Sequence, residues 1–237
     1  MTTPLVFLPD ILCDARLFGP QIAELSAEMP VSFMPLDAGE RLSDLAADVL
    51  AQCPAQVALV GSGLGGLVAM EILRRAPERV GRIALIATSP LQDCPFDTLR
   101  YEPWLVAARA GRLAEVVPAL FGLTEAQPNS ADAEVLALMQ DMAERIGVER
   151  FVRQVRVLQR RQDQQSVLRR CQCPALVIGG AADPVIAPQR YQTMAGFIPD
   201  AELHEIPGAG HVPSLQDPAA VTAALRGWLA RPYVLRG

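Results

Sequence analysis

The feature that most constrains the fold is a series of six short apolar runs, most of them separated by segments with helical periodicity. The middle runs are almost uninterrupted apolar sequence, which is typical of strands buried on both faces of a sheet. Alternation of such strands with helices predicts a mostly parallel sheet in an α/β fold. The six expected strands are PLVFLP (4–9), VSFMPL (31–36), QVALVG (56–61), RIALIAT (82–88), ALVIGG (175–180) and ELHEIP (202–207).

The alternation stops after the fourth run, which ends at residue 88, whereas the fifth begins at residue 175. The long segment between them carries helix-like periodicity over 132–146 and 148–162 and has no strand signal. It therefore reads as a helical lid inserted after the fourth strand. The predicted domains are an α/β core, residues 1–90 and 172–237, and a helical lid, residues 91–171.

Charge and composition disfavour several classes of function. The net charge is -5 and the isoelectric point is about 5.1, so a nucleic-acid partner is not expected. All 21 basic residues are Arg, which excludes Schiff-base chemistry on a lysine. The chain has two histidines, His204 and His211, and neither lies in a cluster of metal ligands. We expect no metal and no other cofactor.

The sequence gives no sign of a membrane or secreted protein. No apolar run approaches the roughly 20 residues that a membrane-spanning helix needs. The N-terminal stretch MTTPLVFLPD lacks the basic region of a signal peptide and reads as the approach to a strand. The five cysteines are odd in number and include no CxxC motif. These observations predict a cytoplasmic protein with no membrane partner.

A glycine cluster, Gly61-Ser62-Gly63-Leu64-Gly65-Gly66, follows the third apolar run and precedes a segment with helical periodicity. It fits the G-x-G-x-x-G turn of dinucleotide-binding folds, and it fits G-x-S-x-G, the nucleophile elbow, with Gly63 in the place of serine. A dinucleotide turn usually follows the first strand, and an acidic residue ends the next strand. Here two runs come first and the next strand ends in IATSP, so the elbow interpretation is favoured.

Two distant residues support the elbow. Asp183 follows the fifth run, and His211 lies in a glycine-rich loop after the sixth. Alone, Asp183 could simply start a turn with Pro184, and His211 could be an ordinary loop histidine. Together they occur in the order nucleophile, acid, histidine, each after the strand where a hydrolase triad places it.

The chain resembles the α/β-hydrolase superfamily, in the compact lidded group of carboxylesterase-like, MenH-like and BioH-like enzymes. The resemblance lies in residues 59–90, 180–188 and 208–218. It implies a nucleophile position at Gly63, which is vacant here, with Asp183 and His211 as catalytic partners. It also implies oxyanion-hole N–H groups at Ile11 and Leu64, although Pro9 and Asp10 stand where the family commonly has a His-Gly pair.

A hydrolase site without its serine leaves several interpretations open. In the first interpretation, the chain is a serine hydrolase of a carboxylic ester or thioester that is inactivated because Gly63 replaced the serine. Alternatively it is a natural enzyme, such as a lyase or cyclase, that uses His211 and Asp183 for acid–base catalysis without a covalent step. A third interpretation is a ligand-binding pseudoenzyme, and the dinucleotide fold stays as a fourth.

The expected partner is a small-molecule ester or acyl substrate. Trp104, in the predicted lid, is the apolar residue that we expect to face the cleft. The stretch 145–170 is rich in arginine, and Arg153, Arg156 and Arg160 share one helical face. That face is either simply solvated or a dock for an anionic or carrier-bound substrate.

Overall fold

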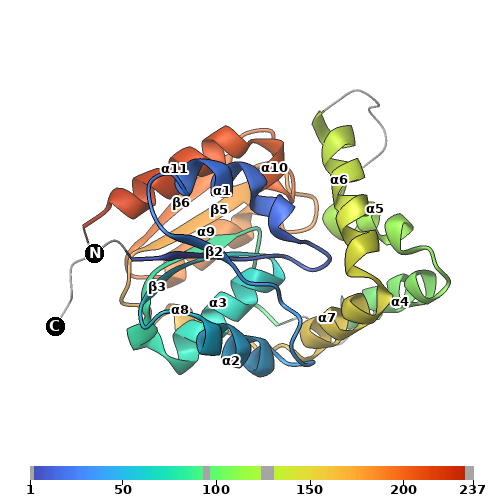
Figure 1. The fold of residues 1–237 in the computed structure, drawn as a ribbon, viewed down its shortest axis with the longest axis horizontal. Coiled ribbons are helices and arrows are strands. Elements are labelled where there is room, and N and C mark those ends of the chain that lie inside the picture. Colours follow the sequence, from blue (N-terminus) through green and yellow to red (C-terminus); the bar gives the residue numbers. More distant parts are fainter. Residues whose placement is uncertain (1–2, 93–96, 124–130, 233–237) are drawn as a thin grey trace.

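The computed structural model describes residues 3–92, 97–123 and 131–232, and its centre is a six-stranded parallel sheet (Figure 1). The strand order is β2-β1-β3-β4-β5-β6. Each of the six predicted runs overlaps one strand, so the α/β prediction is confirmed. The strands are β1 (Leu5–Leu8), β2 (Val31–Phe33), β3 (Val57–Ser62), β4 (Val80–Ile86), β5 (Ala175–Gly180) and β6 (Ala201–Ile206).

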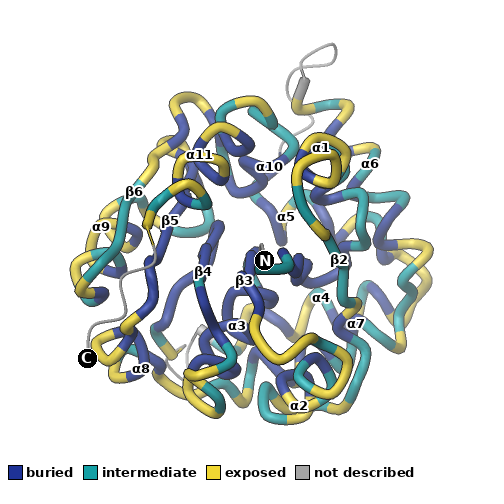
Figure 2. Tube along the Cα trace, turned by 60° about the vertical axis from the view of Figure 1, so that its left-hand side comes forward, coloured by how far each residue is buried: buried dark blue, intermediate teal, exposed yellow. Residues whose placement is uncertain are grey.

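Helices cover both faces of the sheet, and this is why the central strands are uninterrupted apolar sequence. Every residue of β1, β3 and β5 is buried, whereas the edge strand β2 is short and half-buried (Figure 2). The helices α1 and α11 pack together on one face, and α2 packs against α3 on the other (Figure 1). The core helices are α1 (Gly19–Leu25), α2 (Leu42–Gln52), α3 (Leu64–Arg75), α9 (Pro188–Phe197), α10 (Pro213–Gln216) and α11 (Pro218–Ala230).

The segment between β4 and β5 is helical, and none of its described residues forms a strand. Its larger helices, α4, α6 and α7, form a layer beside one end of the sheet (Figure 1). The helical character agrees with the prediction, but a role as a lid and the division into two domains stay predictions. The helices are α4 (Tyr101–Arg109), α5 (Val116–Phe121), α6 (Ala131–Ile146), α7 (Val148–Arg160) and α8 (Gln165–Leu168), with 3-10 turns at Asp97–Arg100 and Leu113–Glu115.

A buried glutamine joins this helical segment to the core. Gln154, on α7, accepts a hydrogen bond from the backbone N–H of Leu12 at 3.0 Å and donates one to the carbonyl of Leu36 at 3.4 Å. Gln154 is only 4% exposed, so the two bonds satisfy polar groups that water cannot reach. Helix α7 therefore holds the loop that follows β1.

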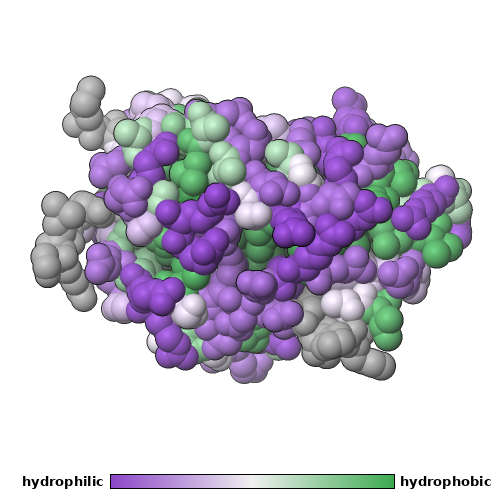
Figure 3. Space-filling model, turned by 90° about the horizontal axis from the view of Figure 1, so that it is seen from below, coloured by the Kyte–Doolittle hydropathy of each residue, from purple (hydrophilic) through white to green (hydrophobic). Residues whose placement is uncertain are grey.

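The described residues expose few large apolar side chains. Among the described residues, no helix combines the length and apolarity needed to cross a membrane. Hydrophilic residues dominate the face seen in Figure 3, interrupted by small apolar areas. Leu99 and Val106 are the large hydrophobic side chains that the described surface exposes, at 60% and 62%.

Candidate active site

The glycine turn is a tight connection between β3 and α3. Gly63 has φ +47° and ψ -112°, in the left-handed region that a side chain makes costly. A Cβ on Gly65 would lie 2.0 Å from the carbonyl oxygen of Leu8, and one on Gly61 would lie 2.4 Å from the carbonyl of Gly65. Strand and helix therefore approach closely, as a nucleophile elbow requires. The turn follows the third strand, which removes support from the dinucleotide interpretation.

Asp183 and His211, predicted from different parts of the chain, come together. The Nδ1 atom of His211 lies 2.8 Å from Oδ2 of Asp183, and both residues are buried. The backbone N–H groups of Val185 and Ile186 donate to Oδ1 of Asp183 at 2.7 and 3.0 Å. The hydroxyl of Tyr191 donates to Oδ2. These donors fix the carboxylate, which in turn fixes the imidazole.

The electrostatics of this pair favour an ionised Asp183. Burial alone would raise the pKa of Asp183, but the hydrogen bond and charge of His211, with the Tyr191 hydroxyl and the Ile186 N–H, outweigh it and lower that pKa. Burial and the charge of Asp183 raise the pKa of Tyr191, so its hydroxyl remains a donor. With Nδ1 directed at a carboxylate, Nε2 of His211 is the nitrogen that can accept a proton from a reactant.

The two N–H groups predicted for the oxyanion hole also come together, and they already have an acceptor. Ile11 and Leu64 both donate to Oδ1 of Asp10, at 2.7 and 2.8 Å. The register of the sheet explains the meeting, because Leu8 at the end of β1 pairs with Gly61 near the end of β3. Sequence reasoning missed this role of Asp10. The available signal was that residues 10 and 63 both depart from the hydrolase pattern.

Asp10 fills the space beside Gly63. A Cβ added to Gly63 would lie 2.0 Å from Cγ, Oδ1 and Oδ2 of Asp10, well inside any real contact distance. Asp10 is 6% exposed, and burial raises the pKa of its carboxyl, opposed by the charge of His211 and the two N–H bonds. A carboxylate therefore stands where the side chain of a serine would begin.

A cavity of about 650 Å³ lies over these groups. Asp10, Gly63, Asp183 and His211 line it from the core. The helical segment contributes apolar and basic walls, and Trp104, the predicted substrate-facing residue, is one of them. The volume is in the range of small-molecule sites. The other lining residues used below are Arg100, Leu120, Phe121, Arg161 and Arg190.

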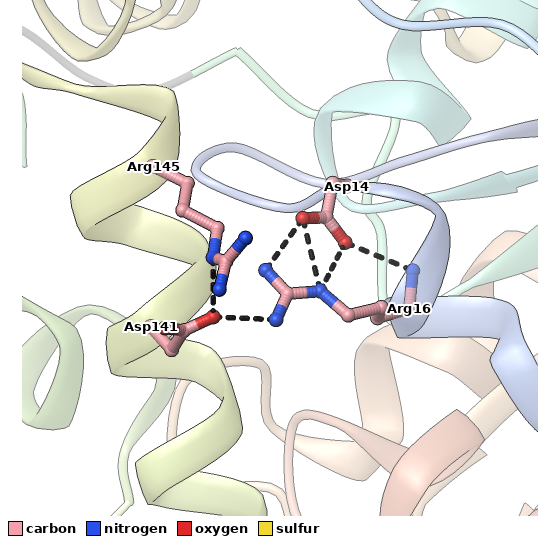
Figure 4. A network of polar contacts seen from close by, with 4 residues as sticks. All are labelled: Asp14, Arg16, Asp141 and Arg145. Atoms are coloured by element: carbon pink, nitrogen blue, oxygen red, sulfur yellow. Dashed lines mark hydrogen bonds and ion pairs between the residues drawn. The ribbon is translucent and has the colours of Figure 1, made fainter.

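Ion pairs hold the helical segment against the core. Arg16, after β1, lies between Asp14 at 2.7 Å and Asp141 of α6 at 2.5 Å (Figure 4). Arg145 contacts the same Asp141 at 2.8 Å. These partly exposed pairs link the loop that carries Ile11 to α6.

The arginine-rich face of α7 is partly paired with core residues. Arg156 and Arg160 both pair with Glu40, the latter at 3.1 Å. Arg150 lies 2.9 Å from Asp37. Much of this charge therefore serves contacts within the chain, which weakens the case for a carrier dock on this face.

Comparison with known proteins gives consistent matches. The model of the "Alpha/beta hydrolase family" matches residues 9–225. A pimeloyl-[acyl-carrier protein] methyl ester esterase of Chromobacterium violaceum is 31% identical over 188 residues, covering 73% of this chain and 70% of that protein. The same kind of esterase from Pectobacterium carotovorum is 29% identical, covering 76% of this chain and 73% of that protein.

Solved structures agree on the fold. A thermophilic esterase from Thermogutta terrifontis superposes with a TM-score of 0.87 at 23% identity, over 98% of this chain and 91% of that one. An enol-lactonase from Burkholderia xenovorans gives a TM-score of 0.85 at 22% identity, over 98% and 92%. At such identities the likeness concerns the fold alone.

Proposed function

Because the chain belongs to the α/β-hydrolase family, we propose that it is a hydrolase whose general base is His211, oriented by Asp183. The observation that carries the proposal is the 2.8 Å contact between these two buried side chains at the wall of the cavity. His211 takes a proton from the attacking group through Nε2, and the Asp183 carboxylate stabilises the imidazolium that results.

The substrate class that we propose first is a carboxylic ester or thioester of a small, partly apolar molecule. The methyl ester esterases among the relatives support an ester, and their names support a carrier-bound acyl chain as one form of it. Trp104, Leu120 and Phe121 give the cavity apolar walls suited to an acyl chain.

The vacant position at Gly63 allows two versions of the catalytic step. In the first, a serine at residue 63 attacks the carbonyl carbon and the N–H groups of Ile11 and Leu64 stabilise the oxyanion, so this chain is an inactivated form. In the second, the chain works without a serine. The Asp10 carboxylate favours the second version, because it accepts both N–H bonds and occupies the space of the serine side chain.

Serine restoration distinguishes the versions. Gly63→Ser, Asp10→Gly and the double variant are assayed on short-chain p-nitrophenyl esters beside the unchanged protein. We expect the double variant to gain at least about 100-fold in kcat/KM, because it restores both the nucleophile and the open N–H pair. Gly63→Ser alone gains little, since its Cβ meets the Asp10 carboxylate.

The controls separate the remaining possibilities. Adding His211→Ala to the double variant abolishes the gain if His211 is the base. Equal gains from Gly63→Ser and the double variant would favour the inactivated serine hydrolase. A folded double variant that is inactive while the unchanged protein hydrolyses these esters would favour the version without a serine. Inactivity of both proteins contradicts hydrolysis of these esters in this cavity. Ligand binding without turnover, indifferent to His211→Ala, would instead mark a pseudoenzyme.

A further inference from the structure

We propose that Asp10 is the nucleophile of this chain, and that its substrate carries a leaving group on a saturated carbon, as an alkyl halide does. The inference rests on the proposed function in one respect, because it takes His211 as the base that activates water. It assigns a role to the buried carboxylate that sequence reasoning did not use.

The Asp10 carboxylate lies beside Gly63, at the place of the elbow side chain. The Cγ atom and both carboxylate oxygens of Asp10 lie 2.0 Å from the point where a Cβ of residue 63 would stand. The carboxylate thus occupies the serine position beside His211 and lines the same cavity. Burial raises the pKa of Asp10, and the charge of His211 acts in the opposite direction, which agrees with their shared place on the cavity wall.

The hydrogen bonds decide which atom attacks. Ile11 and Leu64 hold Oδ1 at 2.7 and 2.8 Å, so Oδ2 is the oxygen available to form a bond to carbon. The two N–H groups favour the ionised carboxylate, which is the nucleophilic form. Burial leaves this carboxylate with little of the water that weakens a nucleophile.

The same hydrogen bonds decide the substrate class. Attack on an ester carbonyl generates an oxyanion on the substrate, which needs donors such as the N–H pair that Asp10 already uses. Displacement at a saturated carbon generates a departing anion instead. The guanidinium groups of Arg100, Arg161 and Arg190 line the cavity and give a positive environment to such an anion.

The proposed reaction has two steps, formation of an ester on Asp10 and its hydrolysis. First, Oδ2 forms a bond to the carbon, the carbon–halogen bond breaks, and the halide leaves with the electron pair, giving an alkyl ester of Asp10. Then His211 removes a proton from water as its oxygen attacks Cγ, and the negative charge develops on Oδ1, facing the N–H groups of Ile11 and Leu64.

Collapse of this intermediate breaks the bond between Cγ and the alkyl oxygen, and His211 returns its proton to the alcohol. The carboxyl group left on Asp10 ionises, so the sum is alkyl halide plus water to alcohol, halide and a proton. One oxygen of Asp10 is replaced by the oxygen of water in each turnover.

The experiment uses the full chain and 1-bromohexane, with bromide release as the assay. We expect turnover by the unchanged protein and a loss of at least about 1,000-fold in Asp10→Asn. Asn has the same shape and still accepts both N–H bonds, so the fold is retained. Asp44→Asn, at an exposed carboxylate on α2, is the matched control and keeps full turnover.

Two mass measurements identify the nucleophile independently of Asp10→Asn. In His211→Ala, one equivalent of bromide is released, and the protein gains one hexyl group on the peptide that contains Asp10. In oxygen-18 water, a single turnover of the unchanged protein places the label in Asp10 and leaves the first alcohol unlabelled.

The outcomes distinguish this inference from the proposed function. Bromide release that survives Asp10→Asn, an adduct elsewhere, or no release at all overturns the nucleophile role. Ester hydrolysis that depends on His211, together with no bromide release from 1-bromohexane, would do the same while leaving the proposed function intact. A stable Asp10 adduct that forms equally with and without His211 supports the nucleophile and overturns the general base.

Discussion

At the scale of single residues, Asp10 and Gly63 determine each other. Gly63 permits a positive φ and leaves room, and Asp10 fills that room and satisfies two N–H groups. Such a buried carboxylate is a cost to folding, because ionisation in a poorly solvated site is unfavourable. A cost of this kind is typical of residues held for function rather than stability.

The pKa of Asp10 makes this cost measurable. Its pKa is raised above 3.8, chiefly by burial, so the folded state binds more protons than the unfolded state between that value and the raised one. Stability therefore falls as the pH rises through this interval. We predict that Asp10→Asn unfolds at a higher temperature than the unchanged protein at pH 7, and that the difference closes below pH 3.8.

Thermal unfolding followed by circular dichroism between pH 3 and 8 checks this prediction. Asp44→Asn, which removes an exposed charge, serves as the control and shows no such pH-dependent difference. A lower unfolding temperature for Asp10→Asn at pH 7 would mean that the N–H bonds to the charged carboxylate outweigh its burial.

At the scale of elements, the helical segment is joined to the loop after β1 by two kinds of contact. Gln154 of α7 bonds to the N–H of Leu12 in a buried site, whereas Arg16 pairs with Asp141 of α6 at the surface. A buried donor that loses its acceptor keeps its whole desolvation penalty, but an exposed ion pair is weakened by solvent and salt. Loss of Gln154 should therefore lower the stability of the protein more than loss of the Arg16 ion pair.

We predict that Gln154→Leu lowers the free energy of unfolding by about 1–3 kcal/mol, because the buried N–H of Leu12 then has no acceptor. Arg16→Ala lowers the free energy of unfolding by no more than about 1 kcal/mol, because the Arg16 side chain is 37% exposed. Urea unfolding of both variants tests the ranking. A larger loss in Arg16→Ala would show that the ion-pair network, rather than Gln154, holds α6 and α7.

The basic face of α7 supports a separate prediction about substrates. Arg156 and Arg160 already pair with Glu40, so Arg153 is the better probe of a carrier dock. If an anionic carrier binds there, Arg153→Glu raises KM about 10-fold for an anionic or carrier-bound acyl ester and leaves KM for a neutral ester unchanged. Steady-state kinetics on both substrates, using the form of the protein that hydrolyses esters, provides the test, and equal effects would contradict the dock.

At the scale of the whole molecule, the sequence was sufficient for the fold and for the proximity of Asp183 to His211. The four central strands, β1, β3, β4 and β5, are buried apolar runs, which is why they could be located. The edge strands β2 and β6 are less buried, and β2 proved much shorter than its run. Asp183 and His211 could be predicted because each follows its own strand in an expected order. Asp10 could not, since its role depends on the register that brings β1 beside β3. Asp10 and Gly63 are far apart in the sequence, so the sequence alone does not reveal their contact.

The competition between Asp10 and a side chain at residue 63 also has an evolutionary consequence. A serine at 63 and a carboxylate at 10 compete for the same space in this arrangement, so substitution at either position changes which residues the other accepts most easily. Homologues should therefore covary at this pair, with serine accompanied by a small residue and glycine accompanied by aspartate. Classifying homologous sequences by residues 10 and 63 together, rather than by the serine alone, would separate proteins that share this Asp10–Gly63 arrangement from hydrolases that simply lost their nucleophile.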